Sequence, residues 1–215
     1  MSFNSIAAHD RSDVRKVFGL VAYAGTGKDT FVRSVNEGST HFWHMYGEKA
    51  LDLPPKVLRY AFADVHKHGV NEELGITMAE YEATKDVVRD DGITIRQIID
   101  HRGAEALREN PNYLIDALKA FLDSHPDDHV MVTDVRTVGE LDFLKRINAT
   151  CIRLFRKEVD TPPPSMRFEH FLDKATTDHL LIGPADEEAV RVAFPQYKDS
   201  KCLGKVIFSS GLSGK

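Results

Sequence analysis

One segment near the start of the chain combines small residues with a lysine, a carboxylate and a hydroxyl in an order that can bind phosphate. Residues 22–30 read AYAGTGKDT. Small residues let successive backbone N–H groups curl around a phosphate, and the N-terminus of a following helix adds the positive end of its dipole. A lysine at the end of such a turn reaches the β- and γ-phosphate oxygens of a nucleoside triphosphate. We therefore predict phosphate binding by Ala24, Gly25, Thr26, Gly27, Lys28, Asp29 and Thr30.

Two positions in this segment differ from the usual phosphate-binding loop. That loop normally begins with glycine and has serine or threonine after the lysine, whereas this chain has Ala22 and Asp29 there. Because Mg²⁺ takes oxygen ligands and one or two carboxylates, we expect it to meet the Asp29 carboxylate or the Thr30 hydroxyl. The alternative is a glycine-rich turn that binds no ligand.

A second carboxylate follows an apolar run later in the chain. Residues 129–133 read HVMVT and lead directly into Asp134, which is typical of a buried strand that ends in an acidic residue. In nucleotide-dependent phosphoryl transfer such a residue holds Mg²⁺ or its water shell. The predicted metal ligands are therefore Asp29, Thr30 and Asp134, and the alternative role of Asp134 is to cap the next turn.

Other charged residues lie where a second substrate would bind. Asp64 and Lys67 follow the apolar run 57–63, and Arg136 comes two residues after Asp134. Arginine binds phosphate through parallel hydrogen bonds, so Arg136 can contact phosphate or pair with Asp134.

More arginines lie in a helical region and beside a proline-rich loop. Arg96 and Arg102 belong to the first group, and Arg156 and Arg167 flank the prolines at 162–164, where a lid could close over the reacting group. The predicted catalytic residues are Lys28, Asp64, Arg96 and Arg136, and Arg156 is predicted to bind the cofactor.

Short apolar runs alternate with amphipathic segments along the chain. They predict strands at 16–22, 57–63, 129–133, 150–155 and 180–182, and helices at 28–36, within 65–127, at 137–148 and after 184. Thr94 and Thr137 are expected to cap helices. We expect residues 37–56 to form a loop or a short insertion and the tail after Gly204 to be peripheral. The alternation predicts an α/β fold with a mostly parallel sheet covered by helices on both faces.

Ligands of such sheets bind beyond the carboxyl ends of the strands. Lys28, Asp64, Asp134 and Arg156 all follow predicted strands, so we expect them at one edge of the sheet. The sequence indicates a single domain over residues 1–215. A helical insertion at about 65–127 and a lid loop at about 156–175 would lie on it.

Composition narrows the class of substrate. The chain has 215 residues, a net charge of −5 and no dense run of Lys or Arg. Proteins that hold long stretches of DNA usually have a basic face, so a small anionic substrate is favoured. The net charge is also compatible with a local groove that binds DNA. With two distant cysteines and no apolar run of about 20 residues, we expect a soluble cytoplasmic protein with no membrane partner.

Two other classes of nucleotide-binding protein match parts of the sequence. Residues 100–103 read DHRG and formally fit the D-x-x-G motif of switch GTPases. They continue an amphipathic helix, however, and the chain has no N-K-x-D motif for reading guanine. An ATPase that binds nucleotide without an acceptor stays open.

Five segments carry a resemblance to a known protein family: 25–30 (GTGKDT), 61–64 (AFAD) with Lys67, 95–103 (IRQIIDHRG), 132–136 (VTDVR) with Glu140, and 149–156 (ATCIRLFR). In combination they resemble the phage-type deoxynucleoside monophosphate kinases, over residues 17–182. The resemblance implies a P-loop NTPase fold of the adenylate-kinase type, with ATP and Mg²⁺ as donor and a deoxynucleoside 5′-phosphate as acceptor. It also implies that Lys28 and Arg136 bind phosphate, that Arg96 lies on the acceptor side, and that a phage-encoded enzyme would act in the host cytoplasm.

The chain departs from this family on the acceptor side. Leu114 replaces an expected Trp, and Arg102 precedes Gly103 where a neutral residue is usual. Residues 167–170 read RFEH, where the lid of the family has the pattern His-x-Ser/Thr-Glu. A related branch of phage kinases phosphorylates the hydroxymethyl group of 5-hydroxymethyluracil in DNA. There a flipped base would enter the pocket, and Asp64 would act as a general base because an alcohol must lose a proton. The sequence leaves open the accepted base, the choice between free nucleotide and DNA, and homodimer formation.

Overall fold

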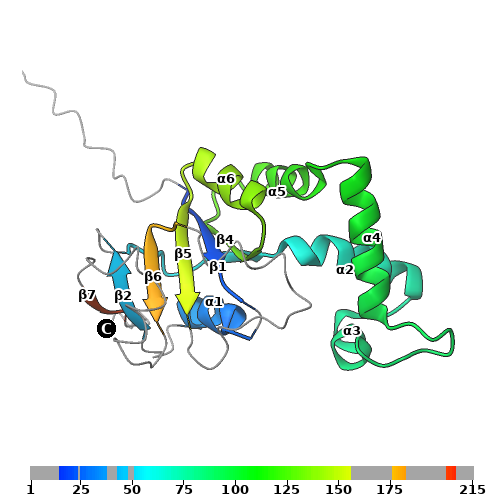
Figure 1. Ribbon diagram of the computed structural model, residues 1–215. Coiled ribbons are helices and arrows are strands. Elements are labelled where there is room, and N and C mark those ends of the chain that lie inside the picture. Colours follow the sequence, from blue (N-terminus) through cyan, green and yellow to red (C-terminus); the bar gives the residue numbers. More distant parts are fainter. Residues whose placement is uncertain are drawn as a thin grey trace, which may run out of the picture.

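A seven-stranded sheet forms the centre of the molecule, with strand order β3-β4-β1-β5-β6-β2-β7 (Figure 1). The computed structural model describes residues 15–23, 25–37, 51–155 and 176–182, together with the backbone of 43–47 and 202–206. The strands are β1 Val17–Val21, β2 Trp43–Gly47, β3 Leu58–Tyr60, β4 Val130–Val135, β5 Thr150–Phe155, β6 His179–Ile182 and β7 Cys202–Val206.

Five of the strands are parallel, which confirms the predicted α/β architecture. β3, β4, β1, β5 and β6 run in the same direction, with β1 in the middle. Residues 37–56, expected to form a loop or a short insertion, contain a strand of the main sheet: β2 pairs antiparallel with β6 and β7. β7 includes Gly204 and lies at the edge of the sheet. These pairings join segments far apart in sequence, so local patterns do not reveal them.

Helices cover both faces of the sheet. α1 packs on one face, where its Phe31 and Val35 join Phe18 and Leu20 of β1 in a buried cluster. α5 and α6 pack on the other face. Gly19 allows this second contact to be close, since a Cβ there would lie 2.7 Å from Cδ1 of Leu144. The helices are α1 Lys28–Glu37, α2 Phe62–Leu74, α3 Met78–Thr84, α4 Ile95–Glu109, α5 Tyr113–Ser124 and α6 Val138–Arg146.

Helices α2, α3 and α4 form an arm that projects to one side of the sheet (Figure 1). We call residues 62–109 the helical arm. The arm has a small core of its own, in which Tyr81 packs with Val70, Ile95 and Ile99. Thr94 accepts a hydrogen bond from the Gln97 backbone in a capping box, as predicted. Within the described ranges, no helix has the length and apolar character needed to cross a bilayer.

The start of the arm corrects one predicted boundary. The strand expected at 57–63 ends at Tyr60, and α2 begins at Phe62. Asp64 therefore lies in the first turn of a helix, where its charge is favourable to the helix dipole, and not directly after a strand.

Removing the arm's largest core side chain should loosen the arm alone. Tyr81 is only 3% exposed and belongs to a cluster separate from the two sheet cores. Truncating a buried aromatic residue costs about 3–5 kcal/mol. We expect Tyr81→Ala to abolish hydrogen-exchange protection in α3 and α4 while β1 and β4 stay protected. Val87→Ala, at a side chain that is 58% exposed, is the control. Equal loss of protection in the arm and the sheet would contradict a separate arm core.

Candidate functional site

The turn between β1 and α1 has a backbone shape that depends on glycine. Gly25 and Gly27 have φ values of 81° and 91°, in the left-handed region that residues with a Cβ rarely adopt. The α1 helix begins directly afterwards at Lys28, and the Phe31 N–H bonds the Gly27 carbonyl at 2.8 Å. Ala24 lies outside the described residues. The chain thus passes from a buried strand through a tight turn into a helix N-terminus.

The carbonyl oxygen of Tyr23 collects the polar side chains of this turn. It accepts hydrogen bonds from the Thr26 hydroxyl at 2.8 Å and from Nζ of Lys28 at 3.1 Å. Thr26 is fully buried, so its hydrogen bond to Tyr23 closes the turn on the side away from solvent. Lys28 folds back across the turn, and its ammonium group lies at the point where the strand ends.

A buried arginine behind the turn was not among the predicted site residues. Arg153 of β5 is 1% exposed, and its guanidinium carbon lies 4.9 Å from the centre of the Tyr23 ring. Such a cation–π contact is favourable, and it places a positive charge next to the turn. The only signal in the sequence is one charged residue within the apolar strand TCIRLF.

Asp134 joins the sheet to the helical arm. It lies inside β4 near its end, is 6% exposed, and accepts the backbone N–H of Phe62 at 2.7 Å and of Ala63 at 2.9 Å on its two oxygens. The carboxylate therefore caps the N-terminus of α2. The alternative considered for Asp134 was a cap on the next turn, whereas the helix it caps precedes it by about 70 residues.

A row of charged side chains runs from α1 to the arm. Asp29 pairs with Nε of Arg59 at 2.7 Å, and Nη1 of Arg59 pairs with Asp64 at 2.5 Å. Asp64 also pairs with Lys67 at 3.1 Å. Burial alone would raise the pKa of Asp64, but the hydrogen bond and charge of Arg59 and the charge of Lys67 hold that pKa below its usual range. The structure therefore brings three predicted residues together through Arg59, which the sequence analysis did not single out.

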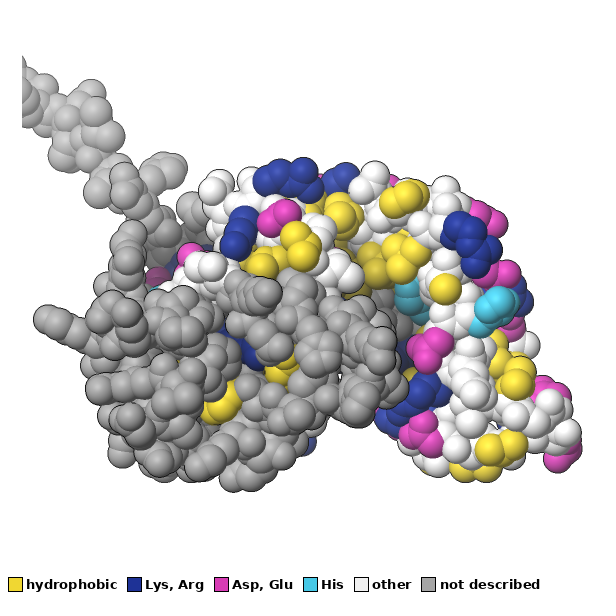
Figure 2. Space-filling view, in the orientation of Figure 1, with side chains coloured by type: hydrophobic (Ala, Val, Ile, Leu, Met, Phe, Trp, Pro, Cys, Tyr) yellow, Lys and Arg dark blue, Asp and Glu magenta, His cyan; other side chains and the backbone are white. Residues whose placement is uncertain are grey.

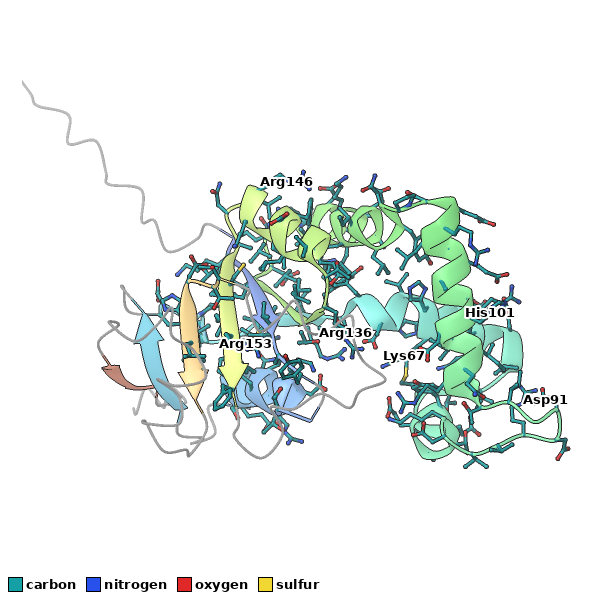
Figure 3. The ribbon with its side chains drawn as sticks, viewed as in Figure 1. Lys67, Asp91, His101, Arg136, Arg146 and Arg153 are labelled. Carbon is teal, nitrogen blue, oxygen red and sulfur yellow. The ribbon has the colours of Figure 1, made fainter. Side chains whose placement is uncertain are left out.

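The loop after β4 is held by a buried glutamate. One oxygen of Glu140 accepts the backbone N–H of Arg136 at 2.6 Å and of Thr137 at 2.9 Å, and Thr137 caps α6 as predicted. Burial raises the pKa of Glu140 to about 7, although the backbone hydrogen bonds act in the opposite direction. Arg136 lies at the carboxyl end of β4, and in Figure 3 both Arg136 and Lys67 lie between the sheet and α4.

Other predicted residues lie apart from this group. Arg96 forms two hydrogen bonds with Asp86, at 2.6 and 3.0 Å, within the arm. Arg102 pairs with Glu73 at 3.2 Å. The predicted lid at 156–175, with Arg156 and Arg167, lies outside the described residues.

The oxygen ligands near the turn suit a hard cation such as Mg²⁺. Asp29 is exposed, and Thr30 lies beside it in the first turn of α1. No group of three or more His, Cys, Asp or Glu in the described ranges could form a complete metal site. Mg²⁺ usually keeps several waters and binds through one or two carboxylates plus phosphate oxygens, so this donor set fits Mg²⁺ bound together with a phosphate ligand.

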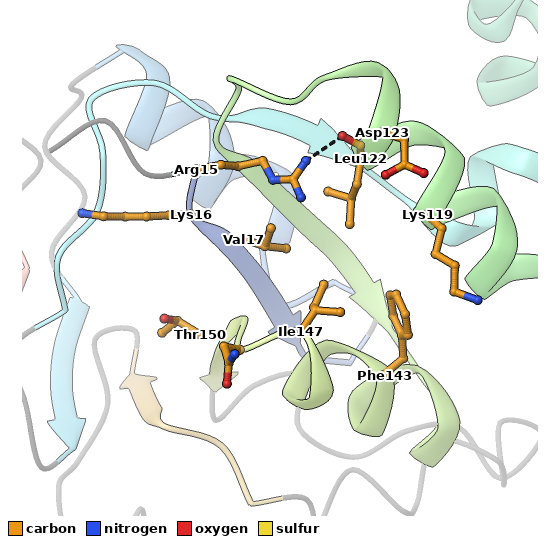
Figure 4. A pocket seen from close by; sticks show the side chains of 10 residues that line it. Arg15, Lys16, Val17, Lys119, Leu122, Asp123, Phe143, Ile147 and Thr150 are labelled. Carbon is orange, nitrogen blue, oxygen red and sulfur yellow. Dashed lines mark hydrogen bonds between the residues drawn. The ribbon is translucent and has the colours of Figure 1, made fainter. Parts of the chain in front are cut away.

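Charged side chains of both signs lie on the helical arm, and Figure 2 shows Lys/Arg and Asp/Glu side chains side by side there. A cavity of about 670 Å³ lies at the end of the sheet opposite the turn, between the start of β1, the end of α5, and α6. There Nη1 of Arg15 donates to the Leu122 carbonyl at 2.6 Å, above an apolar floor that includes Phe143 (Figure 4).

Loss of the Asp134 carboxylate should destabilise the protein even without a ligand. In Asp134→Asn only one side-chain atom can accept, so one of the two backbone N–H groups at the start of α2 loses its acceptor. Hydrogen bonds to charged groups contribute about 1.5–3 kcal/mol, so we expect urea denaturation to show a loss of about 2–3 kcal/mol in unfolding free energy. The exposed Asp90→Asn is the control. Wild-type stability in Asp134→Asn would contradict the capping role.

Glu140 should make stability depend on pH near neutrality. Its pKa is about 7 in the folded protein and about 4.3 in an unfolded chain, so the folded state binds the proton more tightly. Stability from this group is complete below about pH 4 and is lost as the pH rises through 7, by on the order of 4 kcal/mol. In urea denaturation, Glu140→Gln should remove this pH dependence of the unfolding free energy, whereas the exposed Glu72→Gln should retain it. Parallel pH profiles of unfolding free energy for wild type and Glu140→Gln would contradict this role of Glu140.

Comparison with known proteins adds no family assignment to these observations. A scan against protein-family models found no match, and no curated protein matches the chain. The function is therefore inferred from the turn after β1 and the charged row beside it.

Proposed function

We propose that this protein is a P-loop kinase that transfers the γ-phosphoryl group of Mg·ATP to a deoxynucleoside monophosphate. One observation carries the proposal: the glycine turn after the central strand, with Lys28 folded across it at the N-terminus of α1. A turn of this kind offers backbone N–H groups, a helix dipole and an ammonium group to the same phosphate chain. Phosphoryl transfer depends on such positioning and charge stabilisation.

The place of this turn in the sheet supports a ligand site. β4 and β5 flank β1 on opposite sides, and the chain crosses from β4 to β5 through α6. In parallel sheets ligands bind beyond the carboxyl ends of the strands, where the direction of the connections changes. The turn from Tyr23 to Lys28 lies at this point, so an adenylate-kinase-like arrangement is the natural extension of the proposal.

On the donor side, Lys28 and the turn would hold the phosphates, and Asp29 and Thr30 would hold the metal. The Asp134 oxygens each retain acceptor capacity beyond their bond to α2, so Asp134 would act through the metal's water shell. Bound Mg²⁺ neutralises charge on the β- and γ-phosphates. Arg136, and Arg156 in the lid, would add positive charge.

On the acceptor side, the charge of the arm favours a small free nucleotide over DNA. The arm carries eleven acidic and six basic residues, a net charge of −5 that equals the net charge of the whole chain. A polyanion would be repelled by such a surface, whereas a single phosphate needs only local cations such as Lys67 and Arg96. Such an enzyme would work in the cytoplasm, in the host cell if it is phage-encoded.

The state of Asp64 also favours a phosphate acceptor. A hydroxymethyl group must lose a proton, and a good general base has a pKa near the working pH. Asp64 is paired with Arg59 and Lys67, and these partners lower its pKa, so it would be a weak base. A monophosphate is already ionised and needs no base.

Removing the Lys28 ammonium group should abolish transfer without unfolding the protein. We expect Lys28→Ala to lower kcat/KM by at least about 100-fold, on the scale seen when one stabilising donor is lost from an active site. Thermal unfolding is measured alongside, so that a loss of activity with the fold intact can be told from a loss of folded protein. Lys119→Ala, at an exposed lysine of α5, is the matched control. Unchanged turnover in Lys28→Ala would contradict the proposal.

The same assay separates the competing functions. ATP labelled at the γ-phosphate is supplied with a panel of deoxynucleoside monophosphates and, separately, with DNA that contains 5-hydroxymethyluracil. Label in a diphosphate supports the proposal, and label in the DNA would replace it with the DNA kinase. Slow release of labelled phosphate that no acceptor accelerates would indicate an ATPase instead.

A further inference from the structure

Arg59 lies between the turn that joins β1 to α1 and the helical arm. It lies in the middle of β3, and its side chain is 37% exposed. Its partners belong to two different elements: Asp29 is in the first turn of α1, and Asp64 is in the first turn of α2. Among the described residues, Arg59 is the only one that forms ion pairs with both helices.

The guanidinium group is held firmly on one side and weakly on the other. Asp64 is 21% exposed and also pairs with Lys67, whereas Asp29 is 72% exposed. Ion pairs between exposed groups contribute about 0–1 kcal/mol, so the bond to Asp29 is easily exchanged for another anion. Arg59 Nη2 donates to none of the described residues, which leaves N–H groups for a ligand.

A chain of alternating charges runs from α1 through Arg59 into the arm. Two carboxylates and one guanidinium give this group of three a net negative charge, and Lys67 brings it to neutrality. Nζ of Lys67 also lies 3.8 Å from Oε1 of Glu82 in α3, and Glu82 forms an ion pair with Lys85. Positive and negative groups thus alternate from the donor helix into the arm. A phosphoryl group that moves from α1 toward α2 would pass beside Arg59.

We propose that Arg59 is a catalytic residue that binds the phosphoryl group during transfer, an inference that rests on the proposed kinase function. In this step an oxygen of the acceptor phosphate forms a bond to the γ-phosphorus. The bond from that phosphorus to the β–γ bridging oxygen breaks, and its electron pair leaves with ADP. No proton moves, and the charge on the equatorial oxygens is met by the guanidinium fork as it leaves Asp29. Asp64 keeps the guanidinium oriented.

Variants of Arg59 test this role through kcat, KM, ATP affinity and thermal unfolding, measured on the full chain. We expect Arg59→Ala to lose at least about 100-fold in kcat, because arginines that stabilise this transition state contribute about 10³–10⁵-fold. The ATP dissociation constant should change less than about threefold. Arg59→Lys should be similarly impaired, because lysine keeps the charge but lacks the planar fork. Millimolar guanidinium chloride should restore part of the activity of Arg59→Ala and none of Arg59→Lys.

The matched control is Arg102→Ala, which removes an arginine that also lies between two carboxylates but on the far part of the arm. It should keep wild-type kcat. Wild-type kcat in Arg59→Ala or Arg59→Lys would overturn the role of Arg59 alone, as would a fall in unfolding temperature with unchanged kcat. If Arg59→Ala fails to fold, Arg59→Lys decides the question. A wild-type enzyme that labels no acceptor would overturn the kinase proposal and this inference with it.

Discussion

The carbonyl oxygen of Tyr23 is the acceptor around which the turn between β1 and α1 closes. It can receive both Thr26 and Lys28 only because Gly25 and Gly27 take left-handed conformations that bring the chain back over the end of β1. The buried Arg153 lies against the ring of the same tyrosine. This closure fixes where α1 starts. It therefore fixes the position of Lys28 and directs Asp29 toward β3, where Arg59 meets it.

A second constraint links this turn to the helical arm. The Asp134 carboxylate stands at the end of β4, beside β1, and binds the first N–H groups of α2. The arm is thus attached to the same edge of the sheet that carries the turn, and Asp64 and Lys67 follow within the first two turns of α2. The rest of the arm packs around its own small core, which is separate from the two cores of the sheet.

The sequence predicted those features of the fold that depend on residues close together in the chain. The capping boxes at Thr94 and Thr137 lie within three residues of their partners, and both were predicted. The parallel strands and the strand–turn–helix at 17–37 follow from apolar runs and glycines in the same way. The misses involve partners far apart in the chain. β2 pairs with β6 and β7, α2 begins at Phe62 because of Asp134, and Arg59 joins two helices that start 34 residues apart. Periodicity contains no information about which exposed arginine meets which acid across a sheet.

Binding of a triphosphate at the turn between β1 and α1 can be followed residue by residue with backbone amide NMR. A titration of the full chain with Mg²⁺ and a non-hydrolysable ATP analogue reports on each N–H of the turn. Saturable shifts of the Gly25, Gly27 and Lys28 amides, with those of the cavity near Arg15 unchanged, are the predicted result. Unmoved turn amides at saturating analogue, or shifts confined to another surface, would contradict the account.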